Sequence, residues 1–91
     1  MSNEIREQFV RDMQVAGFSE GTQTRYLSLV NGFFKEMWVE PGAVTERNVQ
    51  DFFIFLRGKK VAKETFRGNR FALQFLFCNT LRRDWEFFKK N

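Results

Sequence analysis

The chain has 91 residues, enough for one hydrophobic core, so we expect a single domain over residues 1–91. Hydrophobic residues make up 43% of it and 13 residues are Phe, so large aromatic rings supply the core volume. No apolar run approaches the ~20 residues of a membrane span, and the N-terminus lacks the layout of a signal peptide. We therefore expect a cytoplasmic protein with no membrane partner. The lone cysteine, Cys78, excludes an internal disulfide.

The first half of the chain predicts two amphipathic helices. The first covers about residues 4–16 and ends before Gly17, which can take a left-handed conformation. Its expected buried face is Ile5, Phe9, Met13 and Ala16. The second covers about residues 20–37 and follows Ser19, whose hydroxyl can accept a hydrogen bond from a free amide of the first turn. Its apolar face is Tyr26, Leu29, Val30, Phe33, Phe34 and Met37.

The second half predicts two further helices after a turn at Pro41. One covers about residues 46–57, capped by Thr45 and ended by Gly58, with a buried stripe of Val49, Phe52, Phe53 and Leu56. The other covers about residues 63–80 and is apolar around nearly its whole circumference, through Phe66, Phe71, Ala72, Leu73, Phe75, Leu76, Phe77 and Cys78. The prediction is an all-α fold, a compact orthogonal bundle of four main helices with a short C-terminal extension.

Positive charge is concentrated in residues 57–70. Six Lys and Arg side chains meet a single acid there, Glu64, so this segment nets +5 while the whole chain nets +4. The cations on the fourth helix fall in a narrow strip that ends on a glutamine, at spacings i, i+4, i+7 and i+11: Lys63, Arg67, Arg70 and Gln74. We expect this strip to be the only exposed edge of a buried helix. Like charges at this spacing oppose helix formation by roughly 0.2–0.5 kcal/mol per pair, unless a polyanion neutralises them.

The strip has the residue types of a nucleic-acid contact. Lys59 and Lys60 extend it into the preceding loop, close to a helix N-terminus that also attracts phosphate. Thr65, Asn69 and Gln74 add side chains able to hydrogen-bond base edges. The sequence therefore predicts DNA contact through Lys59, Lys60, Lys63, Thr65, Arg67, Arg70 and Gln74. Two alternatives remain open: a solvated face that keeps the bundle soluble, and a protein-interaction domain whose basic edge binds an acidic partner.

Short motifs stand in order along the chain. They are Gly17-Phe18-Ser19-x-x-Thr22-x-x-x-Tyr26, Phe33-Phe34, Val44-Thr45-x-x-x-Val49-x-x-Phe52, Thr65, Leu73-x-Phe75-Leu76-Phe77, and Asn79-Thr80-Leu81-Arg82-Arg83-Asp84-Trp85. This succession resembles the N-terminal core-binding, SAM-like domain of tyrosine recombinases and phage integrases. The resemblance implies a four-helix domain with its second and fourth helices over the major groove of a recombination half-site. A separate C-terminal catalytic domain would complete a clamp around the duplex.

The resemblance also implies that this chain is not an enzyme by itself. Family catalysis depends on arginines, a lysine, histidines and a nucleophilic tyrosine of the C-terminal domain, whereas this chain has no His and only Tyr26, inside an apolar face. No metal-ligand spacing or phosphate-binding loop is present in the sequence, so we expect no cofactor. The expected partners are double-stranded DNA and the catalytic domain, with the chain monomeric alone and assembling with other protomers on DNA. Thr22, Gln23 and Arg25 are expected as further DNA contacts on the second helix.

The sequence departs from the family pattern at the start of the fourth helix. Ala62 stands where many members have a capping serine. At residues 70 and 71 the family has an apolar residue followed by a small polar one, whereas this chain has the charged Arg70 followed by the apolar Phe71. Near the C-terminus, Trp85, Phe87 and Phe88 are expected to pack under the bundle; the alternative is an exposed site where the missing domain docks. The final Lys89-Lys90-Asn91 falls where the family has its connector, so we expect an excised module or a truncated reading frame.

Overall fold

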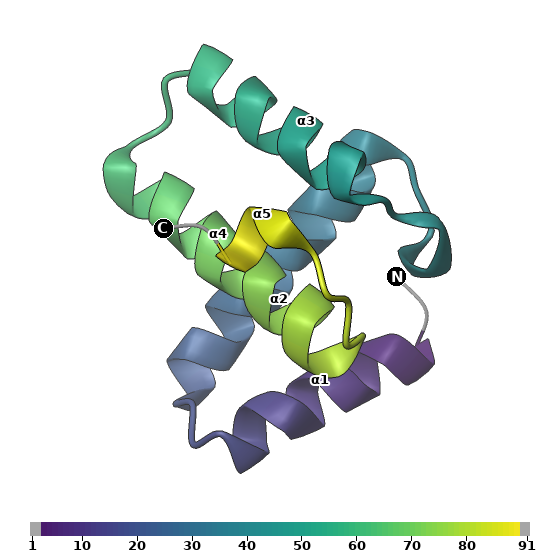
Figure 1. Ribbon diagram of the computed structural model, residues 1–91. Coiled ribbons are helices and arrows are strands. Elements are labelled where there is room, and N and C mark those ends of the chain that lie inside the picture. Colours follow the sequence, from purple (N-terminus) through teal and green to yellow (C-terminus); the bar gives the residue numbers. More distant parts are fainter. Residues whose placement is uncertain (1–2, 90–91) are drawn as a thin grey trace.

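The computed structural model describes residues 3–89, and its regular elements are all helical (Figure 1). In chain order they are α1 (Asn3–Val15), α2 (Glu20–Met37), the 3-10 turn η1 (Pro41–Ala43), α3 (Glu46–Gly58), α4 (Lys63–Gln74), the π-helical η2 (Phe75–Thr80) and α5 (Glu86–Lys89). No strand occurs between residues 3 and 89, so the predicted all-α class is confirmed. In Figure 1, α2 runs across α3 and α4 rather than alongside them.

Local capping explains where α2 and α3 begin. The amide of Thr22 donates to Ser19 Oγ at 3.2 Å, which satisfies one of the free donors of the first turn of α2. At α3, Thr45 and Asn48 cap each other, because the Asn48 amide donates to Thr45 Oγ1 at 3.2 Å and the Thr45 amide donates to Asn48 Oδ1 at 2.8 Å. Both predicted caps are confirmed. By contrast, Ala62 gives α4 no side-chain cap, so packing must hold its first turn.

The helix ends fit the prediction less well. Gly17 has a φ of +85° and ends α1 as expected, but the helix stops at Val15, and Ala16 is exposed instead of lying on the buried face. The helix α3 ends at Gly58, within one residue of the prediction, but Gly58 is not the residue that takes a left-handed conformation. The helical hydrogen bonding continues past it, with the Lys59 amide donating to the Phe55 carbonyl at 3.1 Å, and the left-handed residue is Lys60, with a φ of 56°.

The centre of the core is Phe33, which is fully buried in the middle of α2. Its ring centroid lies 5.1 Å from that of Phe34, 5.0 Å from that of Phe52 on α3 and 5.8 Å from that of Phe77 in η2. Aromatic rings at such separations attract one another beyond their buried area. One side chain thus joins three elements that are far apart in sequence.

The C-terminal aromatic residues pack on the bundle, as predicted. Phe88 is buried, Phe87 stacks on Phe53 with ring centroids 5.3 Å apart, and Trp85 lies 5.1 Å from Phe77. Lys89 forms an ion pair with Asp84. Lys90 and Asn91, which belong to the expected connector, lie outside the described residues.

The helix predicted for residues 63–80 is present, but its last third is wound differently. The α-helix ends at Gln74, and Phe75–Thr80 form a π-helix, in which amides bond five residues back, as the Leu81 amide does to the Leu76 carbonyl at 2.8 Å. Winding of this kind changes the angle between successive side chains. A helical wheel drawn for an α-helix therefore does not apply to the residues after Gln74.

Gly68 is a point at which α4 comes close to side chains of α2. A Cβ atom at this position would lie 2.9 Å from Arg25 Nη2 and 3.3 Å from Leu29 Cδ1. The small residues Gly68 and Ala72 are buried, together with Asn69 and Leu73. Phe71 is 49% exposed. The prediction that α4 is buried everywhere except along the strip of Lys63, Arg67, Arg70 and Gln74 was therefore wrong at Phe71.

Candidate nucleic-acid interface

A groove between α2 and α4 brings together predicted site residues from both helices. It holds about 270 Å³ and is lined by Thr22, Arg25 and Tyr26 of α2 and by Glu64, Arg67, Gly68 and Phe71 of α4. Arg25 crosses it, since its Nη2 donates to the Glu64 carbonyl at 3.4 Å. The two arginines, one from each wall, therefore border a single hollow.

On α4, Lys63 and Arg67 are exposed and occupy one edge of the helix, four residues apart. Thr65 is half-buried, and its carbonyl accepts a hydrogen bond from Asn69 Nδ2 at 2.9 Å. Asn69 is only 4% exposed, so it cannot reach a base edge, and that part of the prediction was wrong. The reason is the rotation of α4, which buries Asn69 together with Gly68, Ala72 and Leu73.

Arg70 and Gln74 do not continue the exposed row. Both are half-buried, and the guanidinium of Arg70 lies 5.4 Å from the centroid of the Phe87 ring, towards α5. Gln74 lines a neighbouring hollow of about 360 Å³ with Phe18, Tyr26, Phe71, Phe75, Cys78 and Asn79. The expected single edge of Lys63, Arg67, Arg70 and Gln74 is thus wrong. The exposed edge runs through Lys63, Arg67 and Phe71, with the acid Glu64 exposed beside them.

The three α2 residues of the prediction have different surroundings. Arg25 is exposed and lies in the groove. Thr22 lines the groove and accepts a hydrogen bond from the Ser19 hydroxyl at 3.0 Å. The side-chain amide of Gln23 donates to the Phe18 carbonyl at 2.9 Å, so it supports the start of α2 and is not a member of the groove lining.

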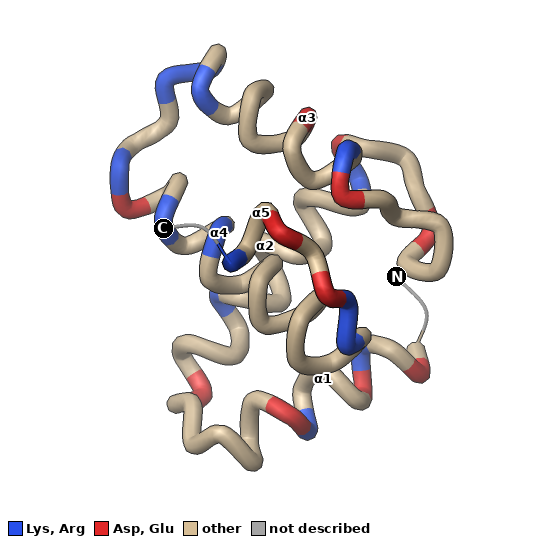
Figure 2. Tube along the Cα trace, viewed as in Figure 1, with Lys and Arg blue, Asp and Glu red and all other residues tan. Residues whose placement is uncertain are grey.

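Further cations lie where α3 leads into α4. Lys59 and Lys60 are exposed there, and Lys59 Nζ lies 5.1 Å from the centroid of the Phe55 ring. Arg57, which was not among the predicted contacts, places its guanidinium 4.5 Å from the Phe66 ring. Figure 2 shows the blue segments gathered at the end of α3, in the α3–α4 connection and on the first turns of α4.

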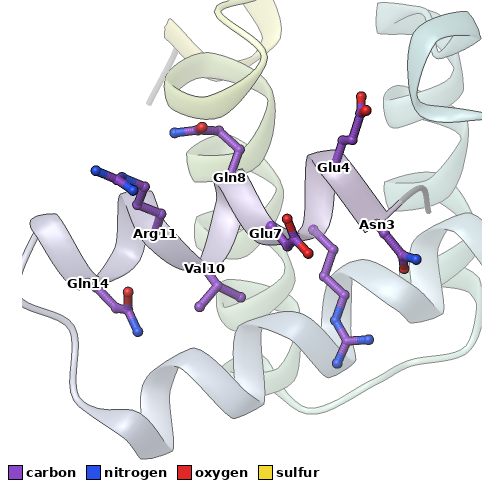
Figure 3. A pocket seen from close by; sticks show the side chains of 8 residues that line it. Asn3, Glu4, Glu7, Gln8, Val10, Arg11 and Gln14 are labelled. Carbon is purple, nitrogen blue, oxygen red and sulfur yellow. The ribbon is translucent and has the colours of Figure 1, made fainter.

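A larger hollow, of about 680 Å³, lies along α1 (Figure 3) and has a different character. Its lining comes from α1 alone and mixes acids, bases and amides: Asn3, Glu4, Arg6, Glu7, Gln8, Val10, Arg11 and Gln14. Figure 3 shows these side chains spreading in different directions from one helix instead of converging. It is therefore not a candidate site.

Within residues 3–89, no three His, Cys, Asp or Glu side chains gather as metal ligands would. Cys78 is half-buried. Its burial is the main reason why the pKa of its thiol is raised, and the nearby Asp84 carboxylate raises this pKa further, so the reactive thiolate is disfavoured. Among the described residues, no helix has the length and apolar character needed to cross a membrane.

Comparison with known proteins gives the family. The family model described as phage integrase, N-terminal SAM-like domain, matches residues 5–87, and the chain belongs to this family. The resemblance inferred from the sequence motifs is thus confirmed.

Over 82 residues the chain is 33% identical to y4qK of Sinorhizobium fredii (strain NBRC 101917 / NGR234), a protein provisionally described by its name as an integrase/recombinase. That match covers 89% of this chain and 27% of the relative, so the chain spans about a quarter of the relative's length. No solved structure matches the chain.

Proposed function

We propose that this chain is the non-catalytic DNA-binding module of a site-specific recombinase and that the α2–α4 groove contacts one recombination half-site. The observation that carries the proposal is the pairing of Arg25 and Arg67 across one groove, with Lys63 exposed on the same edge of α4. Guanidinium groups favour phosphate because their planar donors match its oxygens. The family of the chain and the name of its Sinorhizobium relative support the same function.

Two features of α4 add to the attraction for phosphate. Its first turn has no side-chain cap, so its amides remain available to an anion at the positive end of the helix dipole. Lys59 and Lys60 lie just before that turn and are exposed. In this arrangement Lys59, Lys60 and Lys63 neutralise phosphates of the DNA backbone. Thr22, Arg25 and Arg67 approach the duplex from the two walls of the groove.

The parent protein, in this proposal, is a tyrosine recombinase that cleaves and rejoins DNA strands through a C-terminal catalytic domain. The chain has no histidine and a single tyrosine, Tyr26, whose ring packs edge-on against Phe18 with centroids 5.7 Å apart. Tyr26 serves the packing of α2 and is not the nucleophile. The module binds as a monomer, and the protomers of the parent assemble on DNA, in the bacterial nucleoid.

A salt titration of duplex binding tests this function. Each neutralised phosphate releases counterions, so three to five contacts predict a loss of affinity of roughly 40- to 500-fold for a fourfold rise in salt. The measurement is fluorescence anisotropy of a labelled mixed-sequence duplex with the unmodified chain. A domain that binds an acidic protein instead would show no affinity for the duplex even at low salt.

A further inference from the structure

Phe71 is an exposed aromatic side chain on the basic edge of α4. The exposed large apolar side chains in residues 3–89 are Val15, Trp38, Ile54 and Phe71. Val15 lies at the end of α1, Trp38 after α2, and Ile54 on the outer side of α3. Phe71 alone of these four lines the groove that Arg25 and Arg67 border.

Phe71 lies near other aromatic side chains and near positive charge. Phe71 and Tyr26 line both the α2–α4 groove and the neighbouring hollow. Behind them, Phe18 packs against Phe75 with ring centroids 4.9 Å apart. Phe71 is 49% exposed and lies four residues beyond Arg67, so about half of its surface is available to a ligand.

A ligand that fits this edge must be anionic outside and apolar at a point further in. Duplex DNA has this arrangement in its major groove, where phosphates form the walls and the C5-methyl of thymine is the apolar feature of the base edges. The major groove is also the groove wide enough to admit an α-helix. Lys63 and Arg67, on the same edge as Phe71, match the phosphate walls.

We propose that Phe71 contacts a thymine C5-methyl group and so gives the module a preference for thymine at one position of its half-site. This inference rests on the proposed function, since it requires α4 to enter the major groove. Phe71 contacts the base edge from the groove, since only about half of its surface is exposed. Phosphate contacts position the module, and Phe71 adds sequence preference.

The test compares one duplex synthesised with thymine and the same duplex synthesised with deoxyuridine, which differs from thymidine only by lacking the methyl group. Burial of one methyl group predicts that the unmodified chain binds the thymine duplex about fourfold more tightly. The Phe71→Ala variant should bind both duplexes equally. Ile54→Ala is the matched control, because it removes an exposed apolar side chain from α3 and should keep the fourfold preference.

The outcomes separate this inference from the proposed function. Salt-dependent binding with no preference for thymine, or a preference that Phe71→Ala retains, overturns the role of Phe71 and leaves the DNA-binding function intact. Absence of binding to either duplex at low salt overturns both. Circular dichroism of each variant establishes that it is folded before binding is compared.

Discussion

Duplex binding is expected to be lost when Lys63 and Arg67 are both replaced by Glu, while the helical content stays unchanged. Two cations that contact phosphates are replaced by two carboxylates that phosphates repel. The affinity for the duplex at low salt should therefore fall on the order of 100-fold or more. Both side chains are exposed, so their replacement removes no core contact. A glutamate at the first position of α4 also interacts favourably with the helix dipole. Anisotropy titrations and circular dichroism spectra measure the two effects.

The matched control for this variant is Arg6→Glu/Arg11→Glu. It changes the net charge of the chain by the same amount, but both arginines are exposed on α1, outside the groove. Its affinity should stay within about threefold of the unmodified chain, because screening limits the influence of distant charges to roughly 10 Å. Equal losses in the two double variants would mean that net charge, and not the α2–α4 groove, governs binding.

The largest effect on folding is expected from Phe33→Ala. Phe33 is fully buried and contacts rings from α2, α3 and η2, so its truncation leaves a cavity where three elements meet. Such substitutions cost about 3–5 kcal/mol. The free energy of unfolding of a domain is ~0.05–0.15 kcal/mol per residue, which gives roughly 5–14 kcal/mol for a domain of this size. The variant should therefore lose a large part of its free energy of unfolding and unfold at a markedly lower urea concentration than the unmodified chain.

Urea denaturation followed by circular dichroism measures this loss. Phe71→Ala is the control, since it removes the same side chain from a position that is 49% exposed and should cost under about 1 kcal/mol. Similar losses for the two variants would contradict the assignment of Phe33 to the centre of the core.

The elements could be predicted from the sequence because their signals are local. Ser19 and Thr45 are capping residues followed by periodic apolar residues, and α2 and α3 begin directly after them. Gly17 ends α1 for an equally local reason, its tolerance of positive φ. The end of α3 was predicted to within one residue, but the left-handed turn after it comes from Lys60, a residue type that rarely takes positive φ.

The site could be predicted only in part, because it depends on how α4 is rotated against α2. Nearly every turn of α4 carries an apolar residue, so periodicity does not identify its buried side. Gly68 does, through its close approach to Arg25 and Leu29, and this contact joins residues 39 or more positions apart. The available signal was the small pair Gly68 and Ala72, both of which are buried on α4.

The placement of the site in the α2–α4 groove is tested most directly by mapping a bound duplex on the chain with NMR. Amide shifts recorded during a titration with a short mixed-sequence duplex should change most at Thr22, Arg25, Lys63, Arg67 and Phe71. The amides of α1 and of the first turns of α3 should change least. Shifts concentrated on α1 or on the outer side of α3, or no shifts at all at low salt, would contradict the account.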